Sequence, residues 1–201
     1  MTSTPLPGYP VRIVRLISMA PTGAQVTITT HFKPVGNGFD KPLAAWSLTQ
    51  IPWPERVLVR IPEQADRQSY LQRTPAKEDL FVTRSLGATL VELTRPDEQS
   101  AKTFVEADII DCVYDDVLFL QRQLAAPNGD PWAPHQRAQI FCNTAHAAEV
   151  PPGPRYGELE WTAPLAPTQR LGLNPLRVTW DLVQMKGKRS DAELAKLLKE
   201  K

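Results

Sequence analysis

The chain has 201 residues, 42% of them hydrophobic, which is enough for one large β domain or two small ones with a sizeable core. Its formal net charge is +1 and its basic residues are scattered, so nothing indicates a nucleic-acid partner. No apolar run approaches the roughly 20 residues of a membrane span, and the polar start lacks the features of a secretory signal. We therefore expect a cytoplasmic protein with neither a membrane nor a nucleic-acid partner.

The cysteine and proline content further limits the expected fold class and the kinds of site. For the two cysteines, Cys112 and Cys142, reduced, buried thiols are the usual state, and a disulfide would require neighbouring strands. No Cys/His cluster, phosphate loop or dinucleotide fingerprint is present, so we expect no metal and no cofactor. The 20 prolines lie mainly between apolar runs, which favours many short strands joined by loops.

Alternation of apolar and polar residues predicts the elements in chain order. After a flexible lead-in over 1–10, we expect strands at 11–19, 26–32, 42–52, 57–61, 80–84, 88–94, 103–111, 117–124, 139–143, 156–161 and 176–183. We expect a long loop or a short irregular insert at 62–79 and a turn at 114–116. The first two strands are expected to form a hairpin. A capping-box pattern from Ser190 to Glu193, followed by leucines at helical spacing, predicts a short terminal helix. The expected fold is an all-β, antiparallel β-sandwich over 11–185 with a helical tail over 186–201.

One expected strand carries the chemistry of most interest. Successive side chains alternate between faces, so Tyr156, Glu158 and Glu160 share one face while Leu159 and Trp161 share the other. The two carboxylates then lie roughly 7 Å apart along the strand. An aromatic ring beside paired carboxylates suits a polyol ligand or acid–base chemistry. An ordinary solvated face is the alternative.

Other segments supply further candidate side chains. Trp46 is a candidate platform for stacking against a sugar, with core filling as the alternative. His31 is a candidate general acid because an ordinary histidine titrates near neutral pH. Arg60, Arg84 and Arg122 are candidate anion or hydroxyl binders if they point into one concavity, and otherwise solubilise strand faces.

The order of these segments resembles the galactose mutarotase-like superfamily, in particular an aldose epimerase-like branch. The resemblance rests on segments 26–31, 40–42, 43–50, 118–122, 139–143 and 156–161, with Trp180 in the last strand. It covers residues 11–185 and implies a β-supersandwich with a sugar-facing concave sheet. The chain is short for that fold and corresponds to its later two-thirds, so the first strands would be missing or supplied by a partner.

The resemblance also implies a reaction and its residues. Glu160 would be the base that takes the anomeric hydroxyl proton, with Glu158 or His31 assisting. The family's histidine position falls near Trp46, whose indole donates a hydrogen bond but cannot shuttle a proton. Three readings follow. The first is a carbohydrate- or polyol-binding protein that acts as an aldose 1-epimerase, an isomerase, and the second is a non-catalytic binding or assembly module with a degenerate site. The third is a structural protein whose exposed sheet edge or terminal helix docks a partner, with a homodimer as one such assembly.

Overall fold

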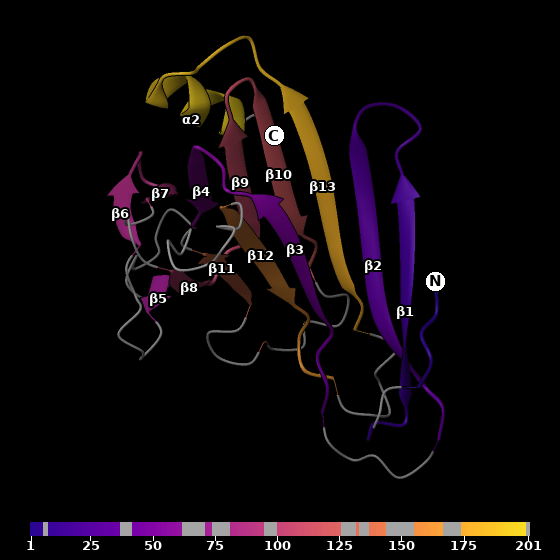
Figure 1. Cartoon of the computed structure of the whole chain (residues 1–201). Coiled ribbons are helices and arrows are strands. Elements are labelled where there is room, and N and C mark those ends of the chain that lie inside the picture. The colour runs from indigo at the N-terminus through magenta and orange to yellow at the C-terminus, as the bar shows by residue number, and fades with distance from the viewer. Residues whose placement is uncertain are drawn as a thin grey trace, which may run out of the picture.

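The computed structural model describes residues 1–5, 8–36, 42–61, 71–73, 81–94, 100–125, 132, 137–143, 155–166 and 174–199. Within these ranges the chain forms two antiparallel sheets followed by one helix (Figure 1). The expected all-β antiparallel sandwich with a short C-terminal helix is confirmed.

The larger sheet has eight described strands. From edge to edge these are β1 (Val11–Met19), β2 (Gln25–Pro34), β13 (Leu176–Gln184), β10 (Val117–Gln123), β9 (Ile109–Tyr114), β4 (Arg56–Arg60), β7 (Leu90–Thr94) and β6 (Val82–Ser85). The expected hairpin is present, with Met19 of β1 opposite Val26 of β2. Near the N-terminus, Thr2 forms an isolated bridge with Val14 on the outer edge of β1.

The smaller sheet has five described strands. In order these are β3 (Trp46–Pro52), β12 (Tyr156–Thr162), β11 (Ala138–Cys142), β8 (Ala101–Val105) and β5 (Leu71–Arg73). Strand β3 is an edge strand, preceded by an isolated bridge between Leu43 and Ala166. The central strand β11 lies between β12 and β8, so three neighbouring strands present their side chains on each face of this sheet.

The main hydrophobic core lies between the two sheets. Leu159 and Trp161 of β12 are 1% and 0% exposed and belong to this core. The indole N–H of Trp161 donates a 2.6 Å hydrogen bond to Oε1 of Gln121 on β10, which joins the sheets through a buried polar contact. The expected alternation is therefore confirmed: Glu158 and Glu160 lie on the other, outer face of the smaller sheet.

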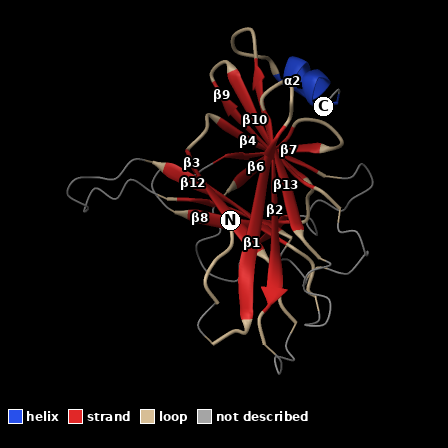
Figure 2. Ribbon diagram, turned by 90° about the vertical axis from the view of Figure 1, so that its right-hand side faces the viewer, coloured by secondary structure: helices blue, strands red, loops and turns tan. Residues whose placement is uncertain are grey.

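Helix α2 (Asp191–Lys199) packs on the outer face of the larger sheet (Figure 2). Its leucines Leu194 and Leu198 are buried in a second cluster with Leu58, Leu118 and Leu120. A helix of nine residues is marginal in isolation, so this apolar contact is what stabilises it. No helix within the described ranges has the length and apolar character needed to cross a membrane.

The start of α2 has the predicted capping box. The main-chain N–H of Ser190 donates to Oε2 of Glu193 at 2.9 Å, and the main-chain N–H of Glu193 donates to Oγ of Ser190 at 3.4 Å. These bonds satisfy amides that have no partner inside the helix. The Ser190 bonds also lower the pKa of Glu193, because they favour its charged form.

Two expectations about the middle of the chain are wrong. The single strand expected over 103–111 is divided between the two sheets, because the chain leaves the smaller sheet at Val105 and enters the larger one at Ile109. The connecting Ala107 is 2% exposed, so the crossing is packed into the core. The expected loop over 62–79 contains the short strand β5.

Candidate functional site

Charged and aromatic side chains gather on the outer face of the smaller sheet. Directly opposed residues on neighbouring strands share a face, and Glu160 lies opposite Gln139 while Phe141 lies between Glu158 and Lys102. Trp46 lies opposite Thr162 at the edge strand of the same sheet. We call this surface the carboxylate face, defined by Trp46, Lys102, Phe141, Tyr156, Glu158 and Glu160.

Glu160 is the centre of the carboxylate face because both of its oxygens have partners. Nζ of Lys102 lies 2.7 Å from Oε1, and the indole N–H of Trp46 donates to Oε2 at 3.1 Å. The Glu160 side chain is 4% exposed and that of Lys102 is 34% exposed. Such a carboxylate needs its partners, since an unpaired buried charge carries its full desolvation cost. Trp46 of β3, Lys102 of β8 and Glu160 of β12 thus form a triad of bonded side chains, which we call the bonded triad.

Glu158 lies beside this triad in a different environment. Partial burial raises its pKa, the negative charge of Glu160 raises it further, and Lys102 partly opposes the shift. Within the described ranges no hydrogen bond or ion pair to its carboxylate is found. The rings of Phe141 and Tyr156 lie next to it, with centroids 6.3 Å apart and planes inclined at 56°. Glu158 is therefore the carboxylate on this face that can meet a ligand.

Trp53 packs closely on the inner face of β12, the strand that carries both glutamates. A Cβ atom at Gly157 would lie 2.8 Å from Cε3 of Trp53 and 3.2 Å from the carbonyl oxygen of Phe141. The Trp53 ring in turn stacks on Phe81, with centroids 6.0 Å apart. Glycine at this position allows an indole to pack directly on the strand between Tyr156 and Glu158.

His31 is not part of this arrangement. It lies on β2 opposite Val14, between Thr30 and Phe32 along the strand. Thr30 is 3% exposed and Phe32 packs against the main core, so both point inward and His31 points outward. The histidine and Glu160 are consequently on opposite outer faces of the sandwich, and the structure does not bring them together.

The candidate arginines are also on the outer face of the larger sheet. Nε of Arg60 lies 2.8 Å from Oδ2 of Asp111, and Arg84 lies opposite Glu92 in the pairing of β6 with β7. Arg122 is on the same face of β10 and lowers the pKa of Asp111 through its positive charge, a smaller effect than burial, which raises that pKa overall. Arg60, Arg84 and Arg122 therefore share one face, but it is not the carboxylate face.

Arg84 belongs to an ion-pair network that holds the start of α2. Glu92 accepts hydrogen bonds from Nε of Arg56 at 2.7 Å and from Nε of Arg84 at 2.9 Å. Both arginines also donate to Asp191, each at 2.8 Å. Burial alone would raise the pKa of Glu92, but the bonds from the two arginines outweigh it and lower the pKa. The same arginines lower the pKa of Asp191. This network has a structural role.

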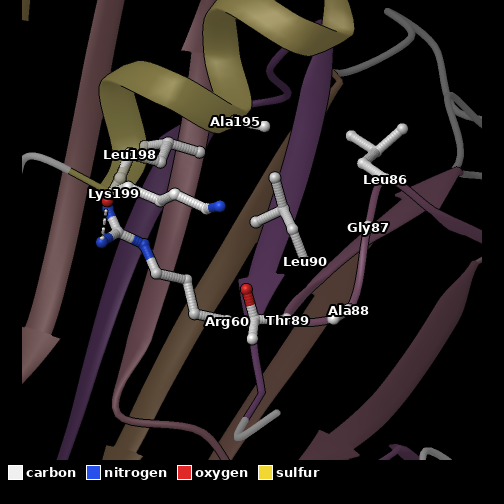
Figure 3. A pocket seen from close by; sticks show the side chains of 9 residues that line it. All are labelled: Arg60, Leu86, Gly87, Ala88, Thr89, Leu90, Ala195, Leu198 and Lys199. Carbon is white, nitrogen blue, oxygen red and sulfur yellow. Dashed lines mark hydrogen bonds between the residues drawn. The ribbon is translucent and has the colours of Figure 1, made fainter.

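Arg60 holds the other end of the helix. It donates from Nη1 to the carbonyl oxygen of Leu198 at 2.6 Å, which satisfies an acceptor in the last turn of α2. Arg60 and Lys199 border a cavity of about 230 Å³ between the helix and the β6–β7 turn, with Leu90 on its apolar wall (Figure 3). Arg122 lines a separate cavity. The three candidate arginines therefore do not converge in one concavity.

Sequence reasoning did not single out Lys102 or Phe141. Lys102 immediately precedes the strand that was expected over 103–111, and its partner Glu160 is 58 residues away. Phe141 is a large aromatic residue on the same face of β11 as the polar Gln139, which is a signal that could have been noticed. Neither position reveals its neighbours without the register of β8, β11 and β12.

Metal and thiol chemistry find no support at the carboxylate face. In the part of the chain that the structure describes, no group of three or more His, Cys, Asp and Glu side chains could hold a metal ion. Cys112 and Cys142 are buried in the core between the sheets, and burial raises the pKa of Cys112.

A scan against protein-family models and searches of curated proteins and solved structures found no match. The site is therefore defined by its geometry.

Proposed function

We propose that the carboxylate face binds a carbohydrate or a related polyol. The observation that carries this proposal is the bonded triad of Trp46, Lys102 and Glu160 beside the solvent-facing carboxylate of Glu158. Polyol hydroxyl groups donate to carboxylates and accept from an ammonium group. The apolar C–H surface of a sugar ring packs on an aromatic ring, and Trp46 is 53% exposed. All three kinds of contact are available on one face.

The resemblance to the galactose mutarotase-like superfamily supports the same ligand class. It assigns the base to Glu160 and an assisting role to His31. However, the oxygens of Glu160 are already bonded to Lys102 and Trp46, and His31 lies on the other outer face. These contacts favour binding over turnover. The carboxylate of Glu158 has no such bond within the described ranges, so it is the one that can accept a hydrogen bond from a ligand hydroxyl group.

Saturation-transfer NMR with a panel of monosaccharides, each at natural anomeric equilibrium, tests the proposal. We expect saturable binding that weakens at least tenfold in Glu158→Gln, because a hydrogen bond to a charged group contributes about 1.5–3 kcal/mol. Trp46→Ala should weaken binding as well, since it removes the exposed ring. His31→Gln is the matched control: it changes another titratable strand residue on the opposite face and should bind like the parent protein.

The outcomes that contradict the proposal are equally specific. The proposal fails if no sugar gives a saturable signal, or if His31→Gln loses as much affinity as Glu158→Gln while both variants keep the parent melting temperature. Exchange spectroscopy on the same samples follows the interconversion of sugar anomers. Acceleration of that interconversion, abolished by Glu160→Gln, would replace a binding function with an aldose epimerase.

A further inference from the structure

The larger sheet extends beyond the smaller sheet at the β1–β2 hairpin. The larger sheet has eight described strands and the smaller has five, and Figure 1 shows β1 and β2 standing clear of β3. On the core-facing side of the sheet three apolar side chains in this region are well exposed: Ile17 at 56%, Met19 at 75% and Leu182 at 54%. No described strand of the smaller sheet covers them.

These exposed side chains continue the core-facing side of the sheet. Ile17 lies opposite Ile28, which in turn lies opposite the core residue Val178. Leu182 lies opposite the core residue Phe119. The exposed residues thus lie on the same face of the sheet as the hydrophobic core. We call this surface the open patch, defined by Ile17, Met19, Val26, Ile28, Trp180 and Leu182.

One edge of β3 pairs with no described strand, and it faces the side on which β13 and β2 lie (Figure 1). The main-chain N–H of Ala163 donates to the carbonyl oxygen of Ala45 at 2.7 Å, so odd-numbered residues at the start of β3 direct their main-chain groups toward β12. In an antiparallel pair the main-chain groups of alternate residues point to opposite sides. No described strand pairs on the other side of β3. The main-chain groups that point there belong to Trp46, Leu48 and Gln50.

We infer that a second copy of this chain covers the open patch, with the two patches packed face to face about a two-fold axis. In both copies the larger sheet exceeds the smaller one at the same place, so the overhang of one copy occupies the vacant layer of the other. The β1–β2 hairpin of one copy then lies beside the β3 edge of its partner. The bridge of Thr2 to Val14 obstructs the alternative in which two β1 edges join.

The open patch is narrow, which favours a weak and reversible association. It spans three strands, about 14 Å at roughly 4.8 Å per strand, so the interface lies at the low end of specific interfaces. We therefore expect a reversible dimer with a dissociation constant on the order of 10–100 µM. This inference does not depend on the proposed sugar binding, because the open patch and the carboxylate face belong to different sheets.

Sedimentation equilibrium of the full chain, from about 5 to about 500 µM, tests the inference because this range brackets the expected constant. The parent protein should pass from monomer to dimer, and Ile17→Lys should remain monomeric. Leu16→Lys is a matched control: Leu16 is the preceding residue on β1, is 57% exposed, and points to the opposite face. It should dimerise like the parent. Leu182→Lys provides a second patch variant on β13.

Folding of each variant is checked by its circular dichroism spectrum and melting temperature. A parent protein that stays monomeric over the whole range overturns the inference, as does equal loss of dimer in the Leu16 and Ile17 variants. In the first case a strand from a different protein becomes the remaining occupant of the open patch. In the second, any dimer uses a surface other than the patch.

Discussion

Replacing Leu198 by alanine should weaken the docking of helix α2 on the larger sheet by about 2–5 kcal/mol. Leu198 is 3% exposed and packs in the cluster that contains Leu58 and Leu118. Three carbon atoms are removed, which at about 0.8 kcal/mol per methylene gives about 2.4 kcal/mol, and the cavity left behind adds to this. Because α2 is the last described element, it can detach while the sandwich stays folded, so the measured loss cannot exceed the docking free energy.

Hydrogen exchange of the α2 amides, compared with amides of the central strands, measures this docking. A loss of 2 kcal/mol corresponds to roughly 30-fold faster exchange in α2, with protection of the strands largely retained. Leu197→Ala is the control, since Leu197 lies on the same turn but is only partly buried. The packing explanation is refuted if α2 exchange is unchanged in Leu198→Ala, or if both variants accelerate it equally.

Acidification should also release α2, because the folded-state pKa values of Glu92 and Asp191 lie below their ordinary values. Their stabilising contribution is present above those ordinary values and is lost as the pH falls below about 4, through the folded-state pKa values. The hydrogen exchange of α2, corrected for its intrinsic pH dependence, should therefore accelerate below that pH. Exchange that stays constant there would show that the network does not hold α2. Gly157→Ala should destabilise the protein by about 1–3 kcal/mol, because its Cβ would lie 2.8 Å from Cε3 of Trp53. Equal urea midpoints for this variant and the parent would show that the Trp53 ring moves aside at little cost.

Local patterns in the sequence were sufficient where the structure is set by neighbouring residues. The alternation over 156–161 correctly separates the buried Leu159 and Trp161 from the outward Glu158 and Glu160, because strand geometry has a period of two residues. The capping box at Ser190 likewise predicts where α2 begins, since its bonds span only three residues.

The same patterns failed where the chain changes sheets. Residues 103–111 continue to alternate in polarity past Val105, and nothing in that alternation shows that the next strand, from Ile109, pairs in the other sheet. Periodicity reports which side chains of a strand are buried, but both sheets bury their inner faces in one shared core. A strand that crosses between them therefore has no distinctive local signal.

The sequence by itself determined the β-sandwich class, the terminal helix and, for strands such as 156–161, the division into an inner and an outer face. Only the tertiary structure decided which outer faces carry the candidate groups: it placed Lys102 and Trp46 on Glu160, and moved His31 and the arginines to the other side of the sandwich. The physical reason is the range of the interactions. Side-chain alternation depends on adjacent residues, whereas strand order and register join segments as distant as Trp46 and Glu160, 114 residues apart, through contacts that no local pattern encodes.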